Sequence, residues 1–197
     1  MLTRRSTPSV LGAMALVSAL ALVACSSDDP TGTGGGNGGG NGSFNANVTG
    51  GVTASFSGVA AQGEGPVEAG QQGWILALGD FTTIANNSIV VELLGTRPPN
   101  GTYQLIDVVA AGDLLPGEWA GFLFLGDGTT ISYFGFSVSG TVTITSSSAE
   151  LVEGTYDFQV SDAGNPPVVA TVTGSFSALA GSVPLGIQAG QLMRLRQ

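Results

Sequence analysis

The stretch Gly140-Thr141-Val142-Thr143-Ile144-Thr145 alternates apolar and hydroxyl side chains without a break. Successive side chains of a strand point to opposite faces, so this pattern predicts one buried and one wet face. The same alternation runs through Tyr156-Asp157-Phe158-Gln159-Val160 and through residues 168–176. Strands of this kind suit antiparallel pairing.

Turn residues divide residues 44–197 into short strands. Asp127-Gly128 separates Phe122-Leu123-Phe124-Leu125 from Ile131-Ser132-Tyr133-Phe134, which predicts a hairpin. The first of these runs is apolar on both faces and predicts a central strand covered on each side, although a partner-binding patch would give the same pattern. We expect about ten strands in one all-β domain, a single antiparallel β-sandwich or flattened barrel. The expected strands are 45–50, 51–60, 73–80, 87–95, 102–110, 119–126, 129–138, 140–147, 151–161 and 168–179.

The first 24 residues have the features of a signal peptide. Arg4 and Arg5 precede an apolar run over residues 10–24. That run is shorter than the roughly 20 residues needed to cross a bilayer as a helix. It ends in Leu22-Val23-Ala24-Cys25, where a polar stretch begins.

This ending resembles the lipobox of bacterial lipoproteins. The resemblance implies cleavage between Ala24 and Cys25, a lipid thioether on Cys25, and acylation of its new amino group. The chain would then be exported and held on the membrane of the cell envelope by diacylglycerol and a fatty acid such as palmitate. Because Ser26 and Ser27, rather than Asp, follow Cys25, the resemblance favours the outer membrane over retention, with the domain in the periplasm or at the surface.

Residues 25–43 predict a flexible, disordered tether between Cys25 and the domain. They are rich in Gly, Ser, Thr and Asn, and such a linker spans about 21–25 Å. The tract Gly34-Gly35-Gly36-Asn37-Gly38-Gly39 formally matches a dinucleotide-binding motif, but it neither follows a strand nor opens a helix.

The charge balance excludes one class of partner. Three arginines remain beyond residue 24 against all fourteen acids, a formal charge of −11. Such a surface repels nucleic acid, and we expect none to bind. The pattern predicts no oligomeric state.

Several catalytic chemistries lack their residues. The chain has no His and no Lys, and Cys25 is its only Cys, so Ser-His-Asp, Cys-His and Schiff-base arrangements are absent. Paired carboxylates remain, with Asp80, Glu92, Glu118 and Asp127 as candidates. Asp127 is explained by the hairpin turn, and Glu92 should face solvent on an alternating strand. We therefore expect no enzyme, with a carboxylate-based hydrolase as the open alternative.

Metal sites have weak support. Zinc requires Cys or His in nearly all its sites. Calcium binds oxygen ligands, and four aspartates lie at expected strand ends or loops, Asp107, Asp113, Asp127 and Asp162. No D-x-D-x-D-G string joins them, so we expect no cofactor, with calcium as the open alternative.

Aromatic side chains offer a ligand platform. Sugar faces stack on exposed rings, and Trp74 and Trp119 are the candidates, with Tyr103, Tyr133 and Tyr156 as further rings. Trp119 follows a Pro-Gly turn at an expected loop edge. The alternative is packing in the core, the usual place of strand aromatics, and we favour it.

Two segments recur within the domain. Residues 52–60 resemble residues 172–180, and Gly101-Thr102-Tyr103 recurs as Gly154-Thr155-Tyr156. Generic strand composition explains both, and pseudo-symmetric halves of a sandwich are the alternative. The strands at 139–145, 152–158 and 172–176 also resemble the closing strands of an uncharacterised family of β-rich bacterial lipoproteins, which implies an all-β fold and no known activity.

These observations favour a membrane-anchored envelope lipoprotein that displays a non-enzymatic domain for binding or structure. Its possible partners are a carbohydrate or an envelope protein, beside the membrane itself. A carbohydrate- or small-ligand-binding β module is the alternative, and a cavity or an exposed Trp would distinguish it.

Overall fold

A computed structural model describes residues 42–68, 71–80, 86–111, 113–162 and 164–181. The chain separates into two units, Met1–Gly38 and Gly39–Gln197. The expected signal peptide, Ala24, Cys25 and most of the expected tether lie outside the described residues. The first strand begins at Gly42, so the last two residues assigned to the tether belong to the domain.

Nine strands and one short helix make up the described domain. In chain order they are β1 (Gly42–Gly50), β2 (Ala54–Glu68), β3 (Gln71–Gly79), β4 (Ser88–Leu93), β5 (Gly101–Gln104), α1 (Val108–Ala111), β6 (Trp119–Gly126), β7 (Ile131–Ser147), β8 (Leu151–Ser161) and β9 (Val169–Ala180). No helix among the described residues has the length and apolar character needed to span a membrane.

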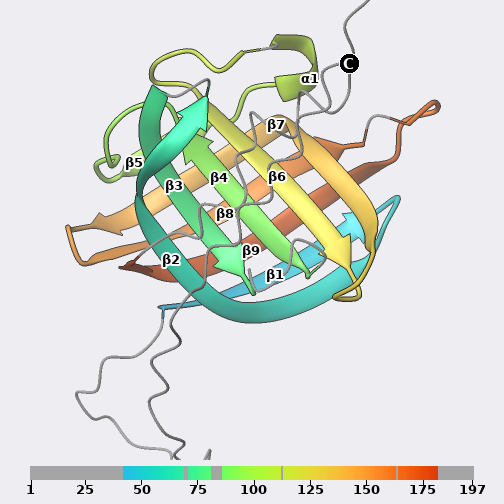
Figure 1. The fold of residues 1–197 in the computed structure, drawn as a ribbon, viewed down its shortest axis with the longest axis horizontal. Coiled ribbons are helices and arrows are strands. Elements are labelled where there is room, and N and C mark those ends of the chain that lie inside the picture. Colours follow the sequence, from blue (N-terminus) through green and yellow to red (C-terminus); the bar gives the residue numbers. More distant parts are fainter. Residues whose placement is uncertain (1–41, 69–70, 81–85, 112, 163, 182–197) are drawn as a thin grey trace, which may run out of the picture. The chain divides into compact units, whose positions relative to one another are not determined.

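The strands form one sheet that closes on itself (Figure 1). Their order is β5-β7-β6-β4-β3-β2-β1-β9-β8, and β7 also pairs with β8. Eight strands therefore close a barrel, and β5 is an extra strand on β7. Every neighbouring pair in this order is antiparallel. The expected all-β fold, a flattened barrel, is confirmed.

Closure depends on the length of β7. Its first part pairs with β6 up to Phe136, and its later part pairs with β8 on one side and β5 on the other. The strand was expected as two, 129–138 and 140–147. Gly140 lies between these parts with a φ of +118°, a conformation that glycine adopts without steric cost. It lets one strand bend where two were predicted.

The hairpin at Asp127-Gly128 is confirmed, because β6 and β7 pair directly across it. The strand expected at 102–110 is wrong in its second half. β5 ends at Gln104, and residues 108–111 form α1. Asp107 Oδ1 accepts a hydrogen bond from Ala110 N at 3.0 Å, so this aspartate caps the helix.

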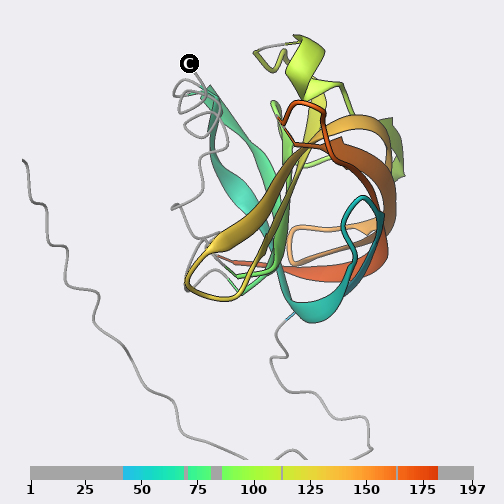
Figure 2. The ribbon, with the colours of Figure 1, turned by 90° about the vertical axis from the view of Figure 1, so that its right-hand side faces the viewer.

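Two apolar clusters lie on opposite faces of the sheet. Figure 2 shows how the strands curve around the barrel interior. The larger cluster fills this interior with side chains from every described strand but β5, whose Tyr103 packs against it. The smaller lies outside β3, β4, β6 and β7 and includes Phe122 and Phe124. Leu123 and Leu125 point inward, so the run at 122–125 is a central strand covered on both faces, as predicted.

Candidate functional site

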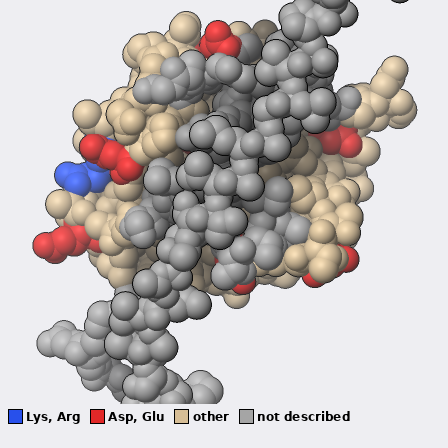
Figure 3. Space-filling view, in the orientation of Figure 1, with Lys and Arg blue, Asp and Glu red and all other residues tan. Residues whose placement is uncertain are grey.

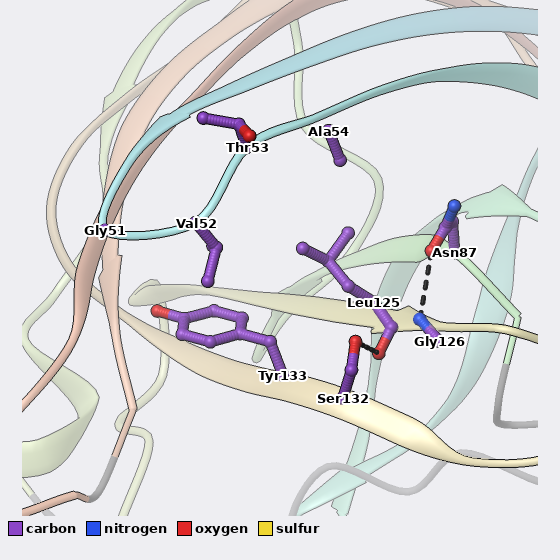
Figure 4. Close-up of a pocket in the computed structure, with 9 residues that line it drawn as sticks. All are labelled: Gly51, Val52, Thr53, Ala54, Asn87, Leu125, Gly126, Ser132 and Tyr133. Carbon is purple, nitrogen blue, oxygen red and sulfur yellow. Dashed lines mark hydrogen bonds between the residues drawn. The ribbon is translucent and has the colours of Figure 1, made fainter.

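A pocket of about 480 Å³ lies at one end of the barrel (Figure 4). Three parts of the chain form it: the turn between β1 and β2, the residue before β4, and the β6–β7 hairpin. The described residues that line it are Gly51, Val52, Thr53, Ala54, Asn87, Leu125, Gly126, Ser132 and Tyr133.

The base of this pocket is continuous with the barrel interior. Leu125 and Tyr133 belong to the interior cluster, and Val52 and Ala54 pack against it. In Figure 4 the side chain of Val52 points toward the Tyr133 ring. A ligand in the pocket would therefore rest on apolar side chains that the barrel holds in place.

Tyr133 is fixed by its own hydroxyl. The Tyr133 hydroxyl donates a hydrogen bond to Val168 O at 2.9 Å. Burial, followed by the nearby Asp162 carboxylate, raises the pKa of Tyr133 to about 12. The phenol therefore stays neutral in the physiological range, and its ring serves as a rigid wall of the pocket rather than as an acid or base.

The rim of the pocket is polar. Asn87 Oδ1 accepts a hydrogen bond from Gly126 N at 3.0 Å, and the Ser132 hydroxyl donates one to Leu125 O at 3.1 Å. In Figure 4 the amide nitrogen of Asn87 points away from Gly126. Asn87, Ser132 and Thr53 thus supply amide and hydroxyl groups beside the apolar base.

None of the described lining residues is Asp, Glu, Lys or Arg. A charged ligand would lose its hydration on entering without gaining a counter-charge from these residues. A neutral molecule with one apolar face and a few hydroxyl or carbonyl groups matches the lining better. The lining offers no paired acid and base for catalysis.

The four candidate carboxylates do not approach this pocket as a group. Asp127 is exposed in the hairpin turn, where its Oδ1 accepts hydrogen bonds from Thr129 N, Thr129 Oγ1 and Thr130 N. The hydrogen bond from the Thr129 side chain, helped by these amides, lowers the pKa of Asp127 to about 2. It therefore cannot act as a general acid near neutral pH.

Glu118 lies far from Asp127. Glu118 Oε2 accepts a hydrogen bond from Leu115 N at 2.9 Å, at the opposite end of β6 from Asp127. Glu118 and Asp127 are nine residues apart along an extended strand, roughly 30 Å, far beyond the 5–9.5 Å of a catalytic pair. Asp80 is exposed after β3. In the view of Figure 3, acidic side chains are dispersed around the visible described surface rather than gathered in one patch.

Glu92 was expected to face solvent, and that prediction is wrong. It is 2% exposed. It points away from the barrel interior, but it pairs with Ile75 on one side and Ala120 on the other, and both belong to the outer apolar cluster. The alternation correctly predicted that the Glu92 side chain points away from the barrel interior. Because the outer apolar cluster lies on that face, pointing outward does not expose the side chain to solvent.

Trp74 and Trp119, the candidates for a ligand platform, do not lie at the surface. The two side chains are 0% and 2% exposed. Trp119 stacks on Tyr103 at 4.5 Å and contacts Trp74 at 5.8 Å between ring centroids. Trp74 Nε1 donates a hydrogen bond to Gln62 Oε1 at 2.8 Å. Core packing, which we favoured, is confirmed.

The loop aspartates serve turns within the described part of the chain. Asp162 Oδ1 accepts hydrogen bonds from Gly164 N and Val168 N, and Asp107 and Asp127 hold α1 and the hairpin as described above. Among the described residues, no three acidic, His or Cys side chains gather in a group that could hold a metal ion.

Sequence reasoning missed the pocket because its residues come from separate segments. Of its lining, only Tyr133 had been singled out, as a ring. The one available signal was the Asp127-Gly128 turn, which places Ser132 and Tyr133 opposite Leu125. No family model, curated protein or solved structure matches the chain.

Proposed function

We propose that this chain is an exported lipoprotein, anchored by Cys25, whose barrel is a non-enzymatic module that binds a small neutral ligand at its mouth. The observation that carries the ligand proposal is the pocket between the β1–β2 turn and the β6–β7 hairpin. Its volume of about 480 Å³ is in the range of pockets that hold small molecules.

The ligand class follows from the lining. Val52, Ala54 and the Tyr133 ring supply an apolar wall, and Asn87 and Ser132 supply polar groups at the rim. A sugar combines an apolar ring face with hydroxyl groups, so a neutral saccharide is the first candidate. The uncharged lining disfavours phosphates, carboxylates and amines.

The anchor proposal rests on the sequence. Leu22-Val23-Ala24-Cys25 ends an apolar run, and a Gly-rich tract separates Cys25 from β1. Several acyl chains on one residue would hold the protein on a membrane far more firmly than one chain can. The tether would let the barrel stand clear of the headgroups of the outer membrane.

A structural role in the envelope is the second candidate. It is favoured by the filled barrel interior, in which Trp74, Phe158 and Leu76 are at most 1% exposed. In that case the mouth pocket would hold only water.

A thermal-shift screen of neutral mono- and disaccharides against the full chain tests the ligand proposal. A binding sugar should raise the unfolding temperature in a concentration-dependent way, because it binds the folded state alone. Titration of any hit then gives its affinity for comparison between variants.

Thr53→Trp and Ser57→Trp make a matched pair for this test. Thr53 lines the pocket and is exposed, so a Trp there should block the mouth and weaken binding at least about tenfold. Ser57 is exposed on β2, outside the pocket, and its substitution should leave affinity unchanged. Equal affinity in both variants, or no shift with any sugar, would contradict the ligand proposal and favour the structural role.

Cys25→Ser tests the anchor independently. The variant should remain an uncleaved precursor and should lose labelling by a fatty-acid analogue. Ser26→Ala, next to it, should be processed and labelled as before. Unchanged processing of Cys25→Ser would rule out the lipobox.

A further inference from the structure

Asn87 and Ser132 hold the two ends of one peptide group at the pocket mouth. Asn87 Oδ1 accepts a hydrogen bond from Gly126 N at 3.0 Å, and the Ser132 hydroxyl donates one to Leu125 O at 3.1 Å. This N–H and this carbonyl belong to the same amide, the peptide bond between Leu125 and Gly126. In Figure 4 the two side chains reach it from opposite sides. They are therefore already spaced to span one amide.

A β-bulge brings Ser132 to this position. Leu125 pairs with Tyr133 and the next residue, Gly126, pairs with Ile131, so Ser132 is an extra residue of β7. Regular alternation would turn Ser132 to the face opposite Tyr133, yet both residues line the pocket. Bulges re-aim side chains in this way. The bulge therefore gives the mouth a hydroxyl group that regular pairing would turn away.

The bond to Gly126 fixes the polarity of the Asn87 amide. A backbone N–H can only donate, so the side-chain oxygen faces it and the NH₂ group faces elsewhere. Asn87 is half-buried and lines the pocket. The hydrogen bonds of the described residues engage its oxygen and leave Nδ2 with its hydrogens to donate. Asn87 therefore offers a ligand a hydrogen-bond donor.

Ser132 offers the complementary group. A hydroxyl has one hydrogen and two lone pairs, and the hydrogen of Ser132 is directed at Leu125 O. Because the side chain is exposed at the mouth, its lone pairs are accessible to a ligand. The pocket thus has a donor on one side of the Leu125–Gly126 peptide and an acceptor on the other.

A secondary amide in the ligand would satisfy both groups at once. Its carbonyl oxygen would accept from Asn87 Nδ2, and its N–H would donate to Ser132 Oγ. It would lie over the Leu125–Gly126 peptide with its dipole reversed, and two amide dipoles in opposite directions attract each other. A single sugar hydroxyl is too short to reach both side chains.

The apolar base of the pocket suits the rest of an acetamido group. Val52 and Ala54 are partly buried against the barrel interior, and they line the pocket together with the Tyr133 ring. A methyl group on the amide carbonyl would leave water for this wall, which is favourable. The lining therefore matches each part of an acetamido group, its carbonyl, its N–H and its methyl.

We propose that the pocket recognises an acetamido group and that its ligand is a neutral N-acetylated sugar. This inference rests on the proposed function and narrows the saccharide to one chemical class. Asn87 and Ser132 determine the specificity, and the apolar wall takes the methyl group and the sugar ring face.

Paired sugars test the class of ligand. N-acetylglucosamine and N-acetylgalactosamine differ from glucose and galactose only in the acetamido group that replaces one hydroxyl. Isothermal titration calorimetry of the full chain should show at least one N-acetylated sugar binding about tenfold or more tighter than its plain partner, because two hydrogen bonds are added. Equal affinities, or binding of plain sugars alone, would overturn this inference and leave the saccharide proposal standing. If no sugar binds, the saccharide proposal itself fails.

Asn87→Asp tests the donor, with Asn47→Asp as the matched control. The change at residue 87 keeps the oxygen that faces Gly126 and replaces the NH₂ group by an acceptor. The ratio of N-acetylated to plain affinity should fall about tenfold or more. Asn47 is exposed on β1 outside the pocket, so the same change of charge there should leave the ratio unaltered. An unaltered ratio in Asn87→Asp would overturn the assigned donor.

Ser132→Ala tests the acceptor, with Ser57→Ala as its control on β2. The ratio of the two affinities should fall in Ser132→Ala and stay at the parent value in Ser57→Ala. Because both ligands are measured on the same variant, a general loosening of the mouth weakens both and cancels in the ratio. Loss of affinity for both sugars at a constant ratio would mean that Ser132 only supports the hairpin, and would overturn its role in specificity.

Discussion

Tyr103 and Tyr156 pair with the same residue, Val142, from opposite sides of β7. The two Gly-Thr-Tyr segments therefore share one register on the two edges of a single strand. Residues 54–60 and 172–177 likewise flank β1 on its two sides. Both recurrences thus flank a shared strand, in the same register for the Gly-Thr-Tyr segments and offset by two residues for the longer pair.

The two tyrosines differ in burial. Tyr156 is 2% exposed, and its hydroxyl donates a hydrogen bond to Asn45 O at 2.6 Å. The Tyr156 ring lies over Gly174, the residue opposite it in β9. Any side chain at position 174 would collide with the phenol. Tyr103 is partly exposed and donates to Pro99 O at 2.7 Å.

Tyr156→Phe should therefore cost more than Tyr103→Phe. Tyr156→Phe removes a buried hydrogen bond and should lower the free energy of unfolding by about 1–2 kcal/mol. Tyr103→Phe removes an exposed hydrogen bond, and its loss should be only a few tenths as large. Urea unfolding of both variants measures the difference. Equal losses would mean that the phenol of Tyr156 is not held by Asn45 O.

Gln62→Ala should destabilise the barrel. Gln62 is 3% exposed and accepts the hydrogen bond of Trp74 Nε1, so its truncation leaves a buried indole N–H without an acceptor, at about 1–3 kcal/mol. Gln104→Ala, at an exposed site on β5, should change the free energy of unfolding little. A neutral Gln62→Ala would argue that water replaces the amide.

Asp127→Ala should weaken the hairpin in a pH-dependent way. The pKa of Asp127 is lowered to about 2 from 3.8, so its stabilisation is full above the unfolded value and disappears as the pH falls through 2. The urea midpoints of parent and variant should therefore differ at pH 6 and converge toward pH 2. Asp113→Ala, an exposed loop site, is the control, and a constant difference for Asp127→Ala would contradict the proposed hydrogen bonds.

Tyr133→Phe should flatten the alkaline limb of the stability profile. The pKa of Tyr133 is raised to about 12 from 10.0. The stabilisation is therefore complete below pH 10 and is lost between pH 10 and 12, as the unfolded chain ionises first. Tyrosinate absorbance reports the ionisation of the tyrosines in the folded and unfolded chains. The urea midpoint at each pH reports the stability of parent and variant. Part of the slope should remain, because burial also raises the pKa of Tyr156.

The sequence predicted the elements well where the cause is local. Alternation defined the strands around Val142 and Phe158, and Asp127-Gly128 defined the hairpin, because side-chain direction and turn geometry depend on neighbouring residues alone. It failed at residues 105–110, where Asp107 caps a helical turn, and at Gly140, where one strand bends without a break.

The sequence by itself determined the all-β class, the absence of His and Lys chemistry, and the expected attachment at Cys25. Only the tertiary structure decided that the sheet closes through β7 and β8, that Trp74 and Trp119 lie inside, and that Glu92 is buried on the outward face. Exposure depends on which distant segments cover a strand, and the mouth pocket exists only where three such segments meet. The alternation of residues along a strand predicts to which face of the sheet a side chain points. Only tertiary packing decides which residues it contacts on that face.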